Sequence, residues 1–279
     1  MPKKYKWMIG LTASFLAVCV MAVSVLCLYS SWQNRTIRVT EYTVSHKDIP
    51  AAFDGKRIVH LTDLHNKDFG EDLTQSVAAL EPDIIVITGD WIGMADEDIT
   101  VAKQQATALV GIAPTYYVAG NHEAVSPFRD ELQKHLQDIG ITVLESKAVL
   151  WEEDGQYVQL LGMFDPEFST HLWRDFAPLV QQDLYSVLLF HRPEYIKEAS
   201  SFGADLILSG HTHGGQIRLP LIGAVFAPNQ GFFPRYDVGR FESGDTTMIV
   251  SQGLGESVYV RILTPPEIVV VTLQSEEVS

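Results

Sequence analysis

At residues 58–65 the sequence reads IVHLTDLH, an apolar, β-rich run that ends in Asp63 and His65. A second run with the same pattern, IIVITGD, occupies residues 84–90 and ends in Asp90. Short apolar runs that stop at polar residues are typical of the buried strands of α/β proteins. In such proteins, ligands bind beyond the carboxyl ends of the strands. The two runs therefore predict an α/β fold with a functional site at one edge of a sheet.

Three further runs end in the same way. They read YYVAGNHE at 116–123, VLLFH at 187–191 and LILSGHTH at 206–213. Together the five runs bring a set of metal-ligating side chains to the predicted edge: Asp63, His65, Asp90, Asn121, His191, His211 and His213. In the Asp-x-His and His-x-His pairs, positions i and i+2 project to the same side of an extended chain, so both side chains can reach one ion or two neighbouring ions.

The chemistry of these side chains narrows the choice of metal. Carboxylate, amide oxygen and imidazole without thiolate suit Mn²⁺, Fe²⁺/Fe³⁺ or Zn²⁺, and the cysteines, Cys19 and Cys27, both lie in an N-terminal apolar run. Seven ligands are too many for one tetrahedral zinc ion but suit two ions that share a carboxylate. Two ions about 3.5–4 Å apart are a known arrangement for phosphoester hydrolysis. The sequence therefore predicts two divalent metal ions as cofactors.

The hydrophobic pattern also predicts the order of helices and strands. Helices are expected at 72–80, 99–110, 127–138 and 193–201, and strands at 58–61, 84–88, 115–118, 158–161, 186–190 and 205–208. The last third is expected to form strands without helices between them, at 246–251, 258–263 and 268–273. Because no Pro/Gly-rich linker divides residues 36–279, we expect one α/β domain of two packed sheets covered by helices.

The N-terminus predicts a membrane anchor. Trp7–Tyr29 is a run of 23 uncharged, mostly apolar residues, which as a helix would reach roughly 34 Å and cross a hydrocarbon core of about 30 Å. A cleavable signal has an apolar region of only about 7–15 residues and then a small-residue site, so we expect an uncleaved, single-pass anchor within residues 1–35. The three lysines before the span favour an extracytoplasmic domain, although Arg35 and Arg38 follow the span closely.

The charge balance argues against a nucleic-acid partner. The formal net charge is −15, and because residues 1–30 hold three lysines and no acid, residues 31–279 carry −18. A nucleic-acid-binding domain normally presents a basic face. So acidic a domain would also repel phosphate-bearing substrates unless metal ions or local arginines reverse the field at the site.

The ordered motifs Asp-x-His, Gly-Asp, Gly-Asn-His-Glu, a solitary His and Gly-His-x-His, over residues 58–213, closely resemble those of the calcineurin-like metallophosphoesterase family. The resemblance implies a metallophosphoesterase-type sandwich of two mixed β-sheets. It also implies a metal-dependent hydrolase of phosphodiester, pyrophosphate or phosphomonoester bonds. By the same resemblance, the first ion is held by Asp63, His65, Asp90 and His213, and the second by Asp90, Asn121, His191 and His211, with Asp90 as the bridge.

One further residue receives a role from this resemblance, and its sequence neighbour is a candidate for supporting it. His122 resembles the family's non-ligand histidine, which protonates the leaving oxygen or stabilises the transition state, and it is the predicted catalytic residue. Glu123 is a candidate for orienting His122, although the side chains of sequence neighbours often diverge.

The form Gly-His-Thr-His-Gly-Gly-Gln and the N-terminal span resemble a membrane-anchored bacterial branch of the family, which includes proteins compared with UDP-2,3-diacylglucosamine pyrophosphatases. This implies a lipid- or nucleotide-linked envelope substrate. The apolar stretches at 217–228 and 232–236 have two open interpretations. They pack over the sheet, or they form an apolar rim beside the metals that suits a lipid-linked phosphoester, with Arg218 or Arg235 neutralising a substrate phosphate.

Two competing functions remain at this stage. The first is a non-catalytic metal-binding scaffold that retains the fold. Loss of a ligand or of His122 would favour this function, but the sequence keeps all of these residues. A mononuclear metal hydrolase of amides or esters would leave several of the seven ligands without a purpose.

Overall fold

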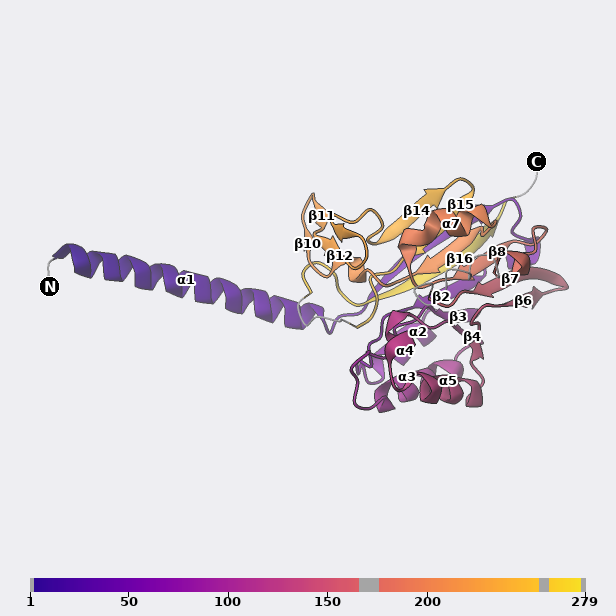
Figure 1. The fold of residues 1–279 in the computed structure, drawn as a ribbon, viewed down its shortest axis with the longest axis horizontal. Coiled ribbons are helices and arrows are strands. Elements are labelled where there is room, and N and C mark those ends of the chain that lie inside the picture. Colours follow the sequence, from indigo (N-terminus) through magenta and orange to yellow (C-terminus); the bar gives the residue numbers. More distant parts are fainter. Residues whose placement is uncertain (1–2, 166–175, 256–260, 277–279) are drawn as a thin grey trace.

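The computed structural model describes residues 3–165, 176–255 and 261–276. Helix α1 (Lys3–Gln33) extends away from the rest of the chain (Figure 1). Its stretch Leu11–Gln33 is long and apolar enough to cross a membrane, by length and composition. The residues after α1 form two six-stranded sheets that pack against each other.

The first sheet is mixed. Its strand order is β1 (Arg38–His46), β16 (Glu267–Ser275), β2 (Arg57–Leu61), β3 (Ile84–Ile87), β4 (Thr115–Tyr117) and β5 (Thr142–Val143). The strands from β2 to β5 are parallel, whereas β16 runs antiparallel to β2. Parallel neighbours need crossover connections, and these contain α2 (Asp72–Ala78), α3 (Thr100–Val110) and α5 (Arg129–Asp138).

The second sheet is also mixed. Its strand order is β14 (Gly239–Ser243), β15 (Thr246–Val250), β9 (Leu206–Ser209), β8 (Ser186–Leu189), β7 (Gln156–Gly162) and β6 (Lys147–Glu153). The four central strands are parallel, and the two edge strands are antiparallel to their neighbours. Between β8 and β9 lie η4 (Pro193–Tyr195) and α7 (Ile196–Ser201).

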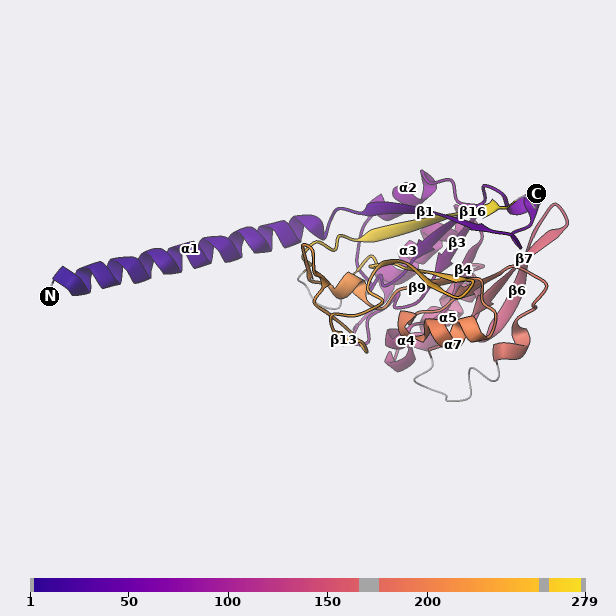
Figure 2. The same cartoon turned by 90° about the horizontal axis from the view of Figure 1, so that it is seen from above.

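Several short elements complete the fold. They are η1 (Ala51–Phe53), α4 (Asn121–Val125), η3 (Ala177–Leu179), η5 (His213–Gly215), and two small hairpins, β10 (Arg218–Leu219) with β11 (Gly223–Ala224) and β12 (Phe226–Ala227) with β13 (Gly231–Phe232). Both hairpins lie at the end of the domain next to α1, in the view of Figure 1 and, turned by 90°, in that of Figure 2.

The central strands are apolar throughout because both of their faces are buried. Ile58 of β2 and Val187 of β8 belong to the core between the sheets. The next residue of β2, Val59, belongs to the core under α2, α3 and α5, and the next residue of β8, Leu188, to the core under α7. Successive side chains of a strand point to opposite faces, so burial on both faces requires uninterrupted apolar runs.

The α/β fold class with two mixed sheets, flanking helices and one N-terminal apolar helix is confirmed. The predicted helices and central strands are present with boundaries shifted by a few residues. The sequence-based prediction missed β1, β5, β6, β14, the short α4 and the strands of the two small hairpins. The predicted strand 258–263 lies partly outside the described residues, and its part from Arg261 forms only an isolated bridge between Ile262 and Ile217.

Candidate metal centre

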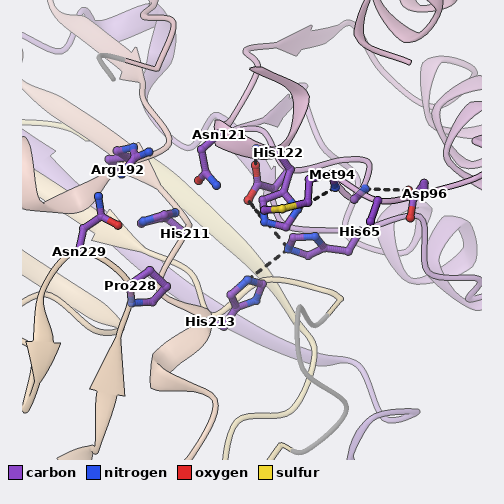
Figure 3. A pocket seen from close by; sticks show the side chains of 13 residues that line it. His65, Met94, Asp96, Asn121, His122, Arg192, His211, His213, Pro228 and Asn229 are labelled. Atoms are coloured by element: carbon purple, nitrogen blue, oxygen red, sulfur yellow. Dashed lines mark hydrogen bonds and ion pairs between the residues drawn. The ribbon is translucent and has the colours of Figure 1, made fainter. Parts of the chain in front are cut away.

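The polar residues at the strand ends meet in one pocket. The pocket has a volume of about 560 Å³ and is lined by His65, Asp90, Asn121, His122, His211 and His213, among others. Figure 3 shows these histidines and Asn121 reaching it from both sheets. The convergence follows from the topology, because the parallel strands of both sheets place their carboxyl ends at this edge of the sandwich.

Many of the predicted ligands have an unusual backbone conformation. Asp63, His65, Asp90, His211 and His213 have positive φ angles of 49–71°. Such angles are uncommon for residues other than glycine, and they cluster at functional sites, where the surrounding structure holds them in place. The chain therefore turns sharply at the strand ends, at the residues whose side chains enter the pocket.

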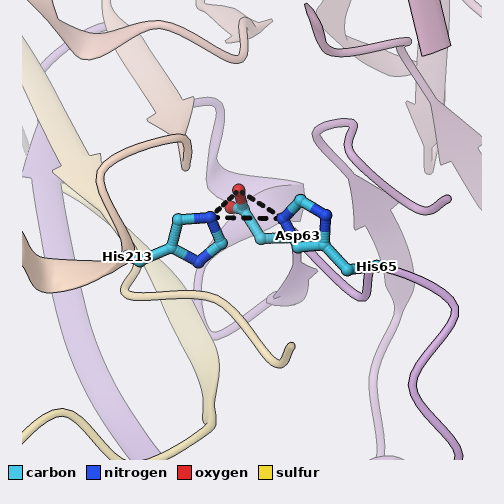
Figure 4. A group of neighbouring side chains, drawn as sticks. All are labelled: Asp63, His65 and His213. Atoms are coloured by element: carbon cyan, nitrogen blue, oxygen red, sulfur yellow. Dashed lines mark hydrogen bonds and ion pairs between the residues drawn. The ribbon is translucent and has the colours of Figure 1, made fainter. Parts of the chain in front are cut away.

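One cluster of possible donors consists of Asp63, His65 and His213 (Figure 4). The Nε2 atom of His213 lies 3.5 Å from Oδ1 of Asp63, and Nε2 of His65 lies 3.8 Å from the same oxygen. The two Nε2 atoms are 3.2 Å apart. One carboxylate and two imidazoles, all within 4.8 Å of one another, form a donor set suited to a divalent metal ion.

A second cluster consists of Asp90, His191 and His211. Nε2 of His191 lies 3.2 Å from Oδ2 of Asp90. Nδ1 of His191 donates a hydrogen bond to the carbonyl oxygen of Thr88 at 2.7 Å. This bond fixes the ring and turns Nε2 toward the pocket, as the outer hydrogen bond of a metal-binding histidine does.

Asp90 belongs to the second cluster and also lies beside the first. Its Oδ2 atom is 4.0 Å from Nε2 of His65, on the side of the first cluster, and 3.2 Å from Nε2 of His191, in the second. Its other oxygen, Oδ1, accepts the backbone N–H of His122 at 2.8 Å. One carboxylate thus stands where a ligand shared by two ions would stand.

Buried polar atoms in the pocket are suited to bind cations. Among the described residues, Oδ1 of Asn121 and Nε2 of His211 are buried without a hydrogen-bond partner. An unpaired buried polar atom costs about 1–3 kcal/mol, a cost that a bound metal ion would remove. The residues present therefore suit two metal ions, one at each cluster.

Burial and neighbouring charges shift the pKa values of the histidines in the pocket. Burial alone would lower the pKa of His191, but the Asp90 carboxylate outweighs it and raises the pKa to about 10. Burial lowers the pKa of His211 and of His213 to about 3, although Asp63 and Asp90 act in the opposite direction. At neutral pH these two imidazoles are uncharged, which is the form that binds a metal ion.

Glycines allow the loops to approach the carboxylates. A Cβ atom at Gly120 would overlap the carboxylate of Asp90, and one at Gly210 would overlap that of Asp63. A side chain at either position would push the loop away from the pocket.

The model of the calcineurin-like phosphoesterase family matches residues 56–215, which contain both clusters. The chain belongs to this family. It is 32% identical to the uncharacterized metallophosphoesterase YkuE of Bacillus subtilis (strain 168), over 86% of each chain. It is 30% identical to the phosphodiesterase YaeI of Escherichia coli (strain K12), over 81% of this chain and 84% of YaeI. A metallophosphoesterase of Aquifex aeolicus (strain VF5), also uncharacterized, is 28% identical over 89% of this chain and 96% of the relative.

Membership confirms the prediction of a metal-dependent phosphoester hydrolase. The family and the two histidine–aspartate clusters together indicate a two-metal site. All seven predicted ligands lie at this strand-end region: six in the two clusters, and Asn121 in the lining of the pocket.

His122 forms a third group of possible donors with His65 of the first cluster and Asp90 of the second. Its Nδ1 atom accepts the backbone N–H of Met94 at 3.2 Å, so the ring proton of the neutral imidazole lies on Nε2. Nε2 is 3.8 Å from Oδ2 of Asp90, and the ring lies 4.5 Å from that of His65, between centroids. His122 thus presents an N–H donor to the pocket next to both ion positions.

The hypothesis that Glu123 orients His122 is wrong. The Glu123 carboxylate is buried and accepts four backbone N–H groups, those of Asp90, Trp91, Ile92 and Gly120, at 2.6–3.1 Å. Burial and the nearby Asp90 raise its pKa to about 7. Glu123 therefore holds together the two loops that carry Asp90 and Asn121. The donors are main-chain groups, so no sequence pattern points to them.

We expect Glu123→Gln to weaken both the fold and the metal site. An amide NH₂ in place of one oxygen faces N–H donors and leaves them unpaired, which should lower the free energy of unfolding by about 2 kcal/mol or more. Because the loop that carries Asp90 loses its support, metal affinity should fall by about 10–100-fold. Thermal unfolding and metal titration of the full chain measure the two effects. Glu152→Gln, at an exposed glutamate, is the matched control. Equal behaviour of the two variants would show that the four hydrogen bonds are dispensable.

The sequence reading also missed Arg192. It follows His191, lines the pocket and is 1% exposed. Its Nε atom pairs with Oδ2 of Asp165 at 2.6 Å. Arg218, by contrast, pairs with Asp237 at 2.6 Å and lies outside the lining of this pocket. Arg192 also lies 3.7 Å from Glu194, so both arginines are ion-paired, and among the described residues Arg192 is the arginine that lines this pocket.

Proposed function

We propose that this family member is a membrane-anchored, two-metal phosphoesterase that cleaves phosphodiester, pyrophosphate or phosphomonoester bonds. The observation that carries the proposal is that Asp90, a member of the second cluster, also lies beside the first. A single site for a mononuclear hydrolase would need only one of these clusters. The relative YaeI, which is named a phosphodiesterase, supports a diester as one substrate class.

The ligands divide between the ions as the clusters do. Asp63, His65 and His213 would hold the first ion and His191, His211 and Asn121 the second, with Asp90 shared. Mn²⁺, Fe²⁺/Fe³⁺ and Zn²⁺ all accept this set of oxygen and imidazole donors. When bound, two such ions lower the pKa of a water molecule to about 7 and stabilise the charge that develops on phosphate oxygens.

His122 would act on the leaving group. Its Nε2–H faces the pocket because Nδ1 is occupied by the N–H of Met94. From there it donates a hydrogen bond, or its proton, to the oxygen that departs from phosphorus. Arg192 would counter the negative charge of the domain at the substrate phosphate.

Residues 1–35 are proposed to form a single-pass anchor and residues 36–279 the phosphoesterase domain. The stretch Leu11–Gln33 supports this assignment, and Lys3, Lys4 and Lys6 favour an extracytoplasmic domain. A substrate at the membrane surface then follows, and a lipid- or nucleotide-linked envelope precursor such as UDP-2,3-diacylglucosamine belongs to that class.

A reconstitution experiment tests the proposal. The purified full chain is loaded separately with Mn²⁺, Fe²⁺ or Zn²⁺, and bound metal is measured by elemental analysis. Hydrolysis is then compared for p-nitrophenyl phosphate, bis-p-nitrophenyl phosphate, a UDP-linked lipid and a glycerophospholipid. We expect two ions per chain and turnover of phosphoesters. Two ions without turnover of any ester would favour the scaffold, and one ion with cleavage of carboxylic esters would favour the mononuclear hydrolase.

A further inference from the structure

The two small hairpins β10–β11 and β12–β13 expose an unusual number of large apolar side chains. We call these side chains the hairpin surface; they are Leu219, Leu221, Ile222, Phe226, Phe232 and Phe233. Leu221 is fully exposed, and Phe232 and Phe233 are 74% and 67% exposed. These side chains are exposed, so the interpretation that this stretch packs over the sheet does not account for them. Contiguous exposed apolar groups mark an interaction site.

The backbone of the hairpins holds these side chains outward. Leu221, at the tip of the first hairpin, has a φ of 69°, and Phe233 has a φ of 56°. Turn positions with positive φ normally take glycine or asparagine, so a bulky apolar residue there accepts strain and places its side chain outside the fold. The hairpins form one unit, because Val225 donates to the carbonyl of Ile217 and Phe233 to that of Val225, both at 3.0 Å.

The same unit is linked to the end of α1 through residues 261–263. In the last turn of α1, the Ser30 hydroxyl accepts the N–H of Arg261 at 3.1 Å, and the Gln33 side chain accepts that of Leu263 at 3.0 Å. Between these two, Ile262 accepts the N–H of Arg218 in β10 at 3.0 Å. Three consecutive residues therefore join α1 to the first hairpin, which explains why the hairpins lie beside α1 in Figures 1 and 2.

This attachment places the hairpins at the level where α1 would leave a bilayer. The apolar run of α1 ends at Tyr29, and at 1.5 Å per residue Gln33 is only about 6 Å further along the helix. Tyr29 and the exposed Trp32 are aromatic residues of the kind found at membrane interfaces. Residues 217–236 contain two arginines and no acid, and although Arg218 pairs with Asp237, this stretch is far less acidic than residues 31–279 as a whole, which carry −18. Anionic lipids would therefore repel this surface less than they would repel the rest of the acidic domain.

The second hairpin also borders the metal pocket. Pro228 and Asn229, in the turn between β12 and β13, line the pocket together with His211 and His213 (Figure 3). On the neighbouring strands, the rings of Phe226 and Phe232 pack edge to face with their centroids 5.5 Å apart, and both side chains remain exposed. One hairpin thus carries both the rim of the pocket and part of the apolar surface.

We propose that the hairpin surface inserts into the membrane leaflet beside α1 and guides the lipid part of a substrate, so that its phosphoester reaches the metal pocket. The inference rests on the proposed function, since it requires that α1 span the bilayer. The occupant of the surface is the bilayer itself, and the substrate is a phosphoester whose lipid tail remains in the leaflet.

Depth-dependent quenching tests the insertion. In the full chain with Cys19→Ser and Cys27→Ser, single cysteines at Leu221, Val20 and Tyr157 are labelled with an environment-sensitive dye. The protein is reconstituted in phosphatidylcholine–phosphatidylglycerol vesicles that carry spin-labelled lipids. We expect the label at Leu221 to be quenched by lipids spin-labelled near the headgroup, and the label at Val20 by lipids spin-labelled deep in the chain. Tyr157, in the β6–β7 hairpin at the other end of the domain, should remain unquenched.

The outcomes separate the two proposals. Quenching at Val20 without quenching at Leu221 overturns the insertion and leaves the anchor intact. Absence of quenching at both positions overturns the anchor and the insertion with it. Quenching by lipid spin labels at Leu221 cannot come from a second copy of the chain, so it distinguishes a bilayer from a protein partner.

A kinetic experiment tests whether the hairpin surface guides the lipid part of the substrate. The triple variant Leu221→Ser, Ile222→Ser, Phe232→Ser should lower kcat/KM for a lipid-linked phosphoester in vesicles by about 10-fold or more. Its kcat/KM for soluble bis-p-nitrophenyl phosphate should remain that of the parent, because none of the three residues lines the pocket. An unchanged ratio of the two activities overturns guidance. If the parent itself cleaves only soluble esters, the lipid-linked substrate class and the guidance both fall, while the quenching result still decides the insertion.

Discussion

Asp90→Asn is expected to abolish stable binding of both metal ions and to lower kcat/KM by about 10³-fold or more, equivalent to about 4 kcal/mol of transition-state stabilisation. The reason is that this carboxylate belongs to the second cluster and also lies within reach of His65 in the first. An amide keeps the shape and one oxygen, but it carries no negative charge to offset the repulsion between two closely spaced dications. Elemental analysis and steady-state kinetics of the purified full chain measure both effects.

Two matched variants sharpen this test. Asp63 belongs to one cluster only, so Asp63→Asn should lose the first ion and retain affinity for the second. Asp96 also lines the pocket, where its carboxylate accepts the N–H of Gly93 at 2.7 Å, but it belongs to neither cluster. Asp96→Asn should therefore keep both ions. Two bound ions and normal turnover in Asp90→Asn would refute the shared carboxylate.

The sequence could predict the central strands and the ligand set because the same short motifs encode both. In IVHLTDLH and IIVITGD, the apolar run determines a strand buried on both faces and the residues after it determine the chemistry. The pocket then follows from the parallel topology, which places strand ends together. The missed strand β1 lacks this signal, since it is an edge strand in which exposed and partly buried residues alternate.

The remaining features depend on contacts between distant parts of the chain. The acceptor role of Glu123 requires the N–H groups that follow β3 to lie against α4, some 30 residues later. Arg192 is fixed by Asp165, 27 residues earlier. The exposure of Leu221 and Phe232 is decided by how the hairpins attach to Arg261–Leu263. Periodicity and composition report which faces are apolar, but they do not report these partners.

His122→Ala is expected to retain both metal ions and to lower kcat by about 10²–10⁴-fold, the usual contribution of a positioned proton donor. His122 belongs to the lining of the pocket, and its Nε2–H points inward because Met94 occupies Nδ1. Removal of the ring takes away a donor without taking away a predicted ligand. His135→Ala, at a half-buried histidine of α5 that contacts Thr107, is the matched control and should leave kcat unchanged.

A comparison of substrates with different leaving groups tests where His122 acts. A nitrophenolate departs as a stable anion and needs little help, whereas an alkoxide develops full negative charge unless a donor reaches its oxygen. The loss of kcat in His122→Ala should therefore be larger for an alkyl phosphodiester than for bis-p-nitrophenyl phosphate. Equal losses for the two substrates would place the contribution of His122 on the phosphate oxygens, and a near-normal kcat for both would remove its catalytic role while leaving the two metal clusters untouched.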